Sequence, residues 1–124
     1  MQRRSCGYTL IELLVVMAAI GLLLAIAAPR YAEHVDRARE TVLRRNLAGL
    51  REAIDKFYAD RSRYPKDLQE LVKERYLREL PVDPVTDRND TWRASAVSGQ
   101  EGSVQDVHSG ATGKGHDGTD YASW

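Results

Sequence analysis

The chain has 124 residues, with 18 basic and 18 acidic side chains and a formal net charge of zero. That balance excludes the strongly basic surface with which nucleic-acid-binding proteins contact phosphates, so we expect no nucleic-acid partner. The length suffices for one small domain behind an N-terminal apolar segment, and the lone cysteine, Cys6, allows no internal disulfide.

The N-terminal segment combines a basic head, a long apolar run and a single carboxylate. Two arginines precede Gly7, and from Tyr8 to Ala28 the only charged residue is Glu12. About 20 residues, at a rise of about 1.5 Å each, cross a hydrocarbon core of ~30 Å. A carboxylate inside such a span costs about 2.5 kcal/mol or more, which indicates a function with a partner. We predict a membrane helix with the arginines on its cytoplasmic side.

The helical pattern continues beyond this span to about Tyr58. Pro29 removes a backbone donor, which predicts either a static kink or a point where the helix melts during assembly. The following pattern is amphipathic, with apolar residues at three- and four-residue steps: Val35, Ala38, Val42, Leu43, Leu47, Leu50, Ile54 and Phe57. Charged residues between them, such as Glu40 and Arg44 at i,i+4 spacing, are expected on a solvated face.

A second, short helix is predicted after Tyr64. Pro65 suits a first helical position, because its missing N–H has no partner within a helix there. Leu68, Leu71 and Val72 follow at helical spacing and supply an apolar face for packing.

The rest of the chain is expected to form a small sheet and irregular loops. Two prolines make residues 81–87 a loop. Residues 91–97 and 104–108 are predicted as strands joined by a turn over 98–103, and the glycine-rich residues 109–124 are expected to lack regular structure. The predicted fold class is α+β, with a small antiparallel sheet.

The string Gly7-Tyr8-Thr9-Leu10-Ile11-Glu12 before an apolar span resembles the type III signal of prepilins and pseudopilins, which usually has Phe in place of Tyr8. The resemblance implies that a prepilin peptidase cleaves after Gly7 and methylates the new N-terminus, Tyr8. Residues 1–7 would then be the leader. It also implies a type IV pilin-like fold, with residues 8–28 as transmembrane and assembly helix and 29–124 as a periplasmic globular domain.

Later landmarks narrow the resemblance to one branch of this family. Tyr64-Pro65, Leu80-Pro81, Asp83-Pro84 and the ending from Asp106 to Trp124 are similar to the major pseudopilin of type II secretion. This resemblance implies an inner-membrane subunit that polymerises into a pseudopilus and drives protein export. Its partners would be further copies of itself, other pseudopilins, the prepilin peptidase, the inner-membrane assembly platform and the lipid bilayer.

Two other functions are kept as alternatives. A type IV pilus subunit, major or minor, would serve adhesion, motility or DNA uptake, but such pilins usually carry a C-terminal disulfide that this chain lacks. A membrane-anchored periplasmic enzyme or metal-binding module belongs to a different class. The sequence shows no convincing catalytic constellation, so we assign no catalytic residue and expect no enzyme.

Glu12 is the candidate assembly residue. It lies one helical turn from Tyr8, so the amine freed by cleavage and the carboxylate share a helix face. In a filament, the Tyr8 ammonium of a neighbouring subunit would neutralise Glu12 and set the axial register. The alternative is a carboxylate near the membrane surface that water defects tolerate.

The C-terminal loop is a candidate calcium site. Flexible loops rich in aspartate and glycine offer the oxygen ligands that calcium takes. The pseudopilin resemblance implies a calcium staple, with Ser109, Asp117, Asp120 and the backbone carbonyl of Val107 as contributors. The family has Gly-Ala-Asp where this chain has Gly-Ala-Thr112, so one carboxylate is missing. A solvated loop with ordinary turn aspartates remains open.

Histidines and tryptophans near the C-terminus are given structural roles. The spacing of His108 and His116 matches no standard zinc pattern, so both are predicted on the surface. Ser109 follows His108, but nothing around it resembles a nucleophile elbow. Trp92 and Trp124 are predicted to lie in the core or to cover it.

Overall fold

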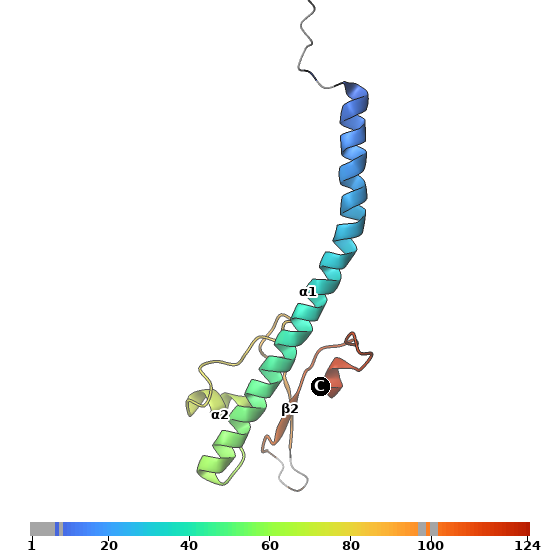
Figure 1. Ribbon diagram of the computed structural model, residues 1–124. Coiled ribbons are helices and arrows are strands. Elements are labelled where there is room, and N and C mark those ends of the chain that lie inside the picture. The colour runs from blue at the N-terminus through green and yellow to red at the C-terminus, as the bar shows by residue number, and fades with distance from the viewer. Residues whose placement is uncertain (1–6, 8, 97–98, 100–101) are drawn as a thin grey trace, which may run out of the picture. The chain divides into compact units, whose positions relative to one another are not determined.

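The structure is a computed structural model that describes residues 7, 9–96, 99 and 102–124 (Figure 1). The elements in chain order are helix α1 (Leu10–Arg61), helix α2 (Leu68–Lys73), strands β1 (Arg93–Ser95) and β2 (Asp106–His108), and the 3-10 helix η1 (Tyr121–Ser123). The predicted α+β class is confirmed. The chain divides into two compact units, Met1–Asp36 and Arg37–Trp124, which are described separately below.

The described part of the first unit is the apolar half of α1. Its large side chains are exposed, from 46% for Val16 to 77% for Leu10. An 18-residue window of α1 has a mean hydropathy of 2.8 and is long and apolar enough to cross a membrane. Pro29 lies inside α1, and the residues on both sides of it are helical. Helical residues on both sides of Pro29 do not distinguish a static kink from a helix that melts during assembly, so both stay predictions.

The second unit has one hydrophobic core, which the C-terminal half of α1 supports. Leu43, Leu47, Leu50, Ile54 and Phe57 of α1 are at most 1% exposed. Side chains from α2 and the sheet region complete the cluster: Leu68, Leu71, Trp92, Val104 and Val107. The predicted apolar face is therefore confirmed from Leu43 to Phe57. The prediction is wrong for Ala38, which is exposed, and for Val42, which is 45% exposed.

The second helix begins later than the sequence predicts. Asp67 is the N-cap of α2, and its side chain accepts a hydrogen bond from the backbone N–H of Glu70 at 2.8 Å. Pro65 is therefore not the first helical residue, and it is fully buried before the helix starts. Capping decides the start, because an aspartate satisfies a backbone donor that a proline only removes.

The two predicted strands form an antiparallel pair but are shorter than expected. β1 and β2 pair in the register Arg93 with His108, Ala94 with Val107 and Ser95 with Asp106. Gly99 and Gly102 of the predicted turn both have positive φ; residues 97, 98, 100 and 101 lie outside the described residues. The three-residue strands leave most of the C-terminal chain irregular, as predicted, apart from η1.

Glycine is required where the chain leaves β2. A Cβ on Gly110 would meet the backbone carbonyl oxygen of Thr91. Because that neighbour is backbone, it cannot rotate away, and only glycine allows the two segments to approach so closely. The segment after β2 is thereby held against the chain that precedes β1.

Candidate functional site

The start of α1 places Glu12 in the first helical turn. The Thr9 hydroxyl oxygen accepts a hydrogen bond from the Glu12 backbone N–H at 3.2 Å, and the Thr9 carbonyl accepts from Leu13 at 3.1 Å. Thr9 therefore acts as the N-cap, in the Thr-x-x-Glu pattern of a capping box. Sequence analysis missed this role of Thr9, although the spacing signals it.

The residues predicted for processing flank this cap. Gly7 is exposed and outside regular structure, whereas Tyr8 lies outside the described residues. The cleavage after Gly7, the methylation of Tyr8 and the pairing of its amine with Glu12 therefore stay predictions. Glu12 itself is exposed near the start of an apolar helix half, and none of the 18-residue apolar window is buried among the residues that the structure describes. Such a surface requires lipid or other helices to cover it.

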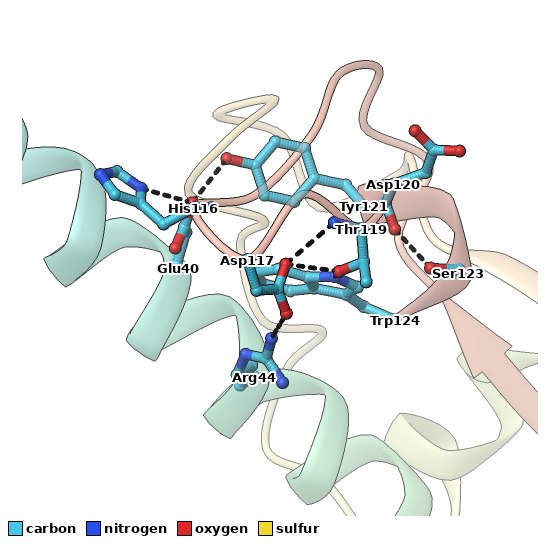
Figure 2. Close-up of polar contacts among 9 residues, drawn as sticks. All are labelled: Glu40, Arg44, His116, Asp117, Thr119, Asp120, Tyr121, Ser123 and Trp124. Atoms are coloured by element: carbon cyan, nitrogen blue, oxygen red, sulfur yellow. Dashed lines mark hydrogen bonds and ion pairs between the residues drawn. The ribbon is translucent and has the colours of Figure 1, made fainter.

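Glu40 of α1 holds the C-terminal loop. Its Oε1 atom accepts from the His116 backbone N–H at 2.9 Å and from the Tyr121 hydroxyl at 3.1 Å, and it lies 3.0 Å from His116 Nδ1 (Figure 2). The Glu40 side chain is only 13% exposed. Glu40, which the sequence predicts on a solvated face, instead accepts hydrogen bonds from residues more than seventy positions further along the chain.

Arg44, one turn along α1, holds the same loop through charge and stacking. Its Nη2 donates to Asp117 Oδ2 at 3.0 Å, and its guanidinium carbon lies 3.9 Å from the ring centroid of Trp124. Trp124 is held in turn by the Thr119 hydroxyl, which accepts from the indole N–H at 2.7 Å. We call Glu40, Arg44, His116, Asp117, Thr119, Tyr121 and Trp124 the C-terminal clasp (Figure 2).

The two carboxylates of the clasp have lowered pKa values. Burial by itself raises the pKa of Glu40, but the hydrogen bonds from the side chain and backbone of His116 and from Tyr121 outweigh it and lower that pKa. Hydrogen bonds from the side chain and backbone of Thr119, with the Arg44 charge nearby, lower the pKa of Asp117. The network therefore favours both side chains in their charged forms.

The structure does not gather the residues predicted to bind calcium. Ser109 is fully buried and donates its hydroxyl hydrogen to Asp83 Oδ2 at 2.7 Å. The Val107 carbonyl accepts from Arg51 Nη2 at 2.9 Å. Both oxygens of Asp117 already accept hydrogen bonds, and the Asp120 carboxylate points away from it in Figure 2.

This arrangement does not fit a calcium ion. Two of the four predicted oxygen donors face arginine guanidinium groups, which repel a cation. Within the described residues, no group of three or more histidine, cysteine, aspartate or glutamate side chains is placed to hold a metal ion. Calcium binding itself stays a prediction.

The histidines and the serine that sequence analysis discussed have separate partners. His108 Nδ1 lies 2.7 Å from the Trp124 carbonyl oxygen, and its Nε2 lies 3.6 Å from Asp106 Oδ2. Ser109 instead bonds Asp83, so serine and histidine do not form a nucleophile and base pair. Trp92 is in the core, where its indole donates to the Pro81 carbonyl at 2.8 Å.

Comparison with known proteins identifies similar chains. Residues 2–28 match the family described as the prokaryotic N-terminal methylation motif. The chain is 35% identical to the type II secretion system core protein G of Pseudomonas aeruginosa, over 68% of this chain and 71% of that protein. It is 28% identical to the protein of the same name from Klebsiella michiganensis, over 100% of this chain and 96% of that protein.

Pilins are also among the similar proteins. The chain is 31% identical to the type IV major pilin protein PilA of Myxococcus xanthus, over 77% of this chain but 40% of that protein. No solved structure matches the chain significantly.

Proposed function

This chain belongs to the family of the type II secretion system core protein G, and on that premise we propose that it is a structural subunit of a secretion pseudopilus. The observation that carries the proposal is the N-terminal motif at residues 2–28, joined to a helix long and apolar enough to cross a membrane. The share of each relative's length that this chain matches supports a role in secretion rather than in a type IV pilus. The core G relative from Klebsiella michiganensis is matched over 96% of its length, the Myxococcus xanthus pilin over 40%.

The proposed mechanism is mechanical. The precursor is anchored in the inner membrane by residues 8–28, with the leader in the cytoplasm and the C-terminal domain in the periplasm. A prepilin peptidase cleaves after Gly7 and methylates Tyr8. The assembly platform then adds subunits, with other pseudopilins, and the growing filament moves cargo towards the outer membrane. This role requires no catalytic group.

Glu12 sets the register in this proposal. The cap by Thr9 keeps Glu12 in the first turn of α1. A carboxylate is costly to leave unpaired in lipid, so an incoming subunit is retained where its Tyr8 ammonium meets Glu12. Pro29 lies further along the same helix and is the second proposed assembly residue.

One experiment tests processing and assembly together. The full chain is expressed with a prepilin peptidase and the other secretion components, as wild type, Gly7→Ala and Glu12→Gln. We expect intact mass spectrometry to show loss of residues 1–7 and gain of one methyl group in wild type and Glu12→Gln, but an unprocessed Gly7→Ala. We expect sheared filaments and cargo in the medium from wild type alone, because glutamine carries no charge to pair.

The controls separate the possible failures. Gln2→Ala changes the leader away from the cleavage point and is expected to behave as wild type. A Gly7→Ala chain that is processed to the mass of mature wild type would contradict the requirement for glycine at the cleavage point. A mature wild-type mass that does not correspond to loss of residues 1–7 would contradict the cleavage position. Filaments that form while cargo stays in the periplasm would contradict the secretion role and favour the type IV pilus alternative.

A further inference from the structure

The C-terminal clasp joins two segments that are far apart in the sequence. Arg44 and Asp117 are separated by 73 positions, and Glu40 and His116 by 76. The loop from Gly113 onward has internal hydrogen bonds of its own, among them those from the Tyr121 N–H to the Gly113 carbonyl at 3.1 Å, from the Gly115 N–H to the Thr119 carbonyl at 2.9 Å and from the Gly118 N–H to the Gly115 carbonyl at 3.1 Å. The contacts with Glu40 and Arg44 join this loop to α1.

The Asp117 carboxylate has a cationic partner within the clasp. Arg44 supplies a cation directly to Asp117, the carboxylate on which a loop-bound metal would depend. The remaining Asp117 oxygen accepts from the backbone N–H of Thr119 at 3.0 Å and from its hydroxyl at 2.6 Å. Both oxygens of Asp117 therefore already accept hydrogen bonds from within the chain.

Glycine keeps the stacking partner in position. A Cβ on Gly115 would meet the ring of Trp124. Because Gly115 has no side chain, the indole can lie flat between the loop and the Arg44 guanidinium, 3.9 Å from its ring centroid. Tyr121 packs edge-on against the same ring with 5.0 Å between centroids. The Trp124 ring therefore lies between Gly115 of the loop and Arg44 of the helix, and Tyr121 packs against it.

We infer that this chain fastens its C-terminal loop to α1 by direct contacts of Glu40 and Arg44, in place of a divalent cation. The inference does not depend on the role proposed above, because it concerns only how the second unit is held together. It predicts a domain whose C-terminal order is independent of calcium and sensitive to two helix residues.

Hydrogen exchange of the full mature chain in detergent measures this fastening directly. Within residues 113–124, the backbone amides of Gly115, His116, Gly118, Thr119 and Tyr121 donate hydrogen bonds, so their exchange rates report opening of the clasp. We expect the same rates in excess EDTA and in millimolar calcium chloride. We expect Arg44→Met to raise them about tenfold, since it removes both an ion pair and a cation–π contact, and Glu40→Gln to raise them in the same peptides.

Matched variants separate this inference from a calcium site. Arg45→Met removes an exposed neighbouring arginine, and Glu52→Gln removes a carboxylate 67% exposed on the same helix. Neither is expected to change exchange at 113–124. Asp120→Asn removes a predicted calcium ligand outside the clasp and is also expected to have no effect.

Three results would overturn the inference. The first is faster exchange of this segment in EDTA that calcium reverses. The second is a loss of protection in Asp120→Asn. The third is an Arg44→Met chain whose loop is as protected from exchange as that of wild type. Glu40→Gln tests the other helix residue of the clasp independently.

Discussion

Asp83 and Ser109 are fully buried polar residues, and each satisfies the other. Ser109 Oγ donates to Asp83 Oδ2 at 2.7 Å and accepts from the Ala111 backbone N–H at 3.1 Å. Asp83 Oδ1 accepts from the Val85 backbone N–H at 2.8 Å. The pair ties the loop after Pro81 to the chain that leaves β2, so Ser109 has a structural explanation that requires no metal.

Replacing Ser109 by alanine should destabilise the second unit. The substitution leaves Asp83 Oδ2 buried without its hydroxyl donor, which costs about 1–3 kcal/mol of unfolding free energy. Urea unfolding of the full chain in detergent, followed by tryptophan fluorescence, measures the loss. Ser123→Ala is the control, because its hydroxyl donates to the Asp120 carbonyl on the exposed surface. Equal losses for the two variants would contradict the role of the buried pair.

At the scale of the elements, α2 shows how capping sets the ends of a short helix. Asp67 caps its first turn, and Glu70 reaches back to accept from the Lys66 backbone N–H at 2.6 Å. Arg63 Nη2 donates to the other Glu70 oxygen at 2.6 Å. A six-residue helix is unstable alone, so these contacts and its buried face hold it in place.

The Glu70 network predicts a dependence of stability on pH. The hydrogen bond from Arg63, then that from the Lys66 backbone, lowers the pKa of Glu70 below its ordinary value of 4.5. An acid whose pKa is lowered by folding binds fewer protons in the folded state, so its contribution is complete above pH 4.5. The contribution is lost as the pH falls through the folded pKa.

Unfolding free energies of wild type and Glu70→Gln, measured between neutral pH and about pH 3, test this expectation. We expect a stability gap that is constant at neutral pH and narrows below the ordinary pKa of the carboxyl. Glu52→Gln is the control, since Glu52 forms an exposed i,i+4 pair with Lys56. If the difference in unfolding free energy between wild type and Glu70→Gln stays constant down to acidic pH, the carboxylate charge is not what stabilises the start of α2.

At the scale of the whole molecule, stability of the second unit rests on one core. Leu50 lies in its centre and is 0% exposed, whereas Val42 on the same helix is 45% exposed. Leu50→Ala should reduce the unfolding free energy by about 2–5 kcal/mol, because a cavity remains where the side chain packed. Val42→Ala should cost far less. Urea unfolding of the full chain compares them, and similar losses would contradict a single shared core.

Much of the fold was predictable because its signals are local. The apolar span, the buried face of α1 from Leu43 to Phe57 and the antiparallel pairing of β1 with β2 all follow from periodicity and turn residues a few positions apart. The start of α2 was placed too early, because proline at a first helical position competes with an aspartate cap two residues later. The two local rules conflict there, and the cap by Asp67 decides where the helix starts.

The candidate site divides in the same way. Gly7, Tyr8 and Glu12 are recognisable from one continuous string of residues, and the cap by Thr9 follows from its three-residue spacing to Glu12. The residues of the C-terminal clasp show no comparable pattern in the sequence. Glu40 and Arg44 resemble any i,i+4 pair on a solvated helix until the loop is placed over them.

The membrane-length helix, the family and the candidate processing point follow from the order of the residues alone, because each depends on neighbouring residues in an unbroken stretch. The partners of the C-terminal loop are set by folding. Glu40 meets His116, Arg44 meets Asp117 and Asp83 meets Ser109, at separations of 76, 73 and 26 positions. Side chains so far apart in the chain become partners only after the core has packed and brought their segments together.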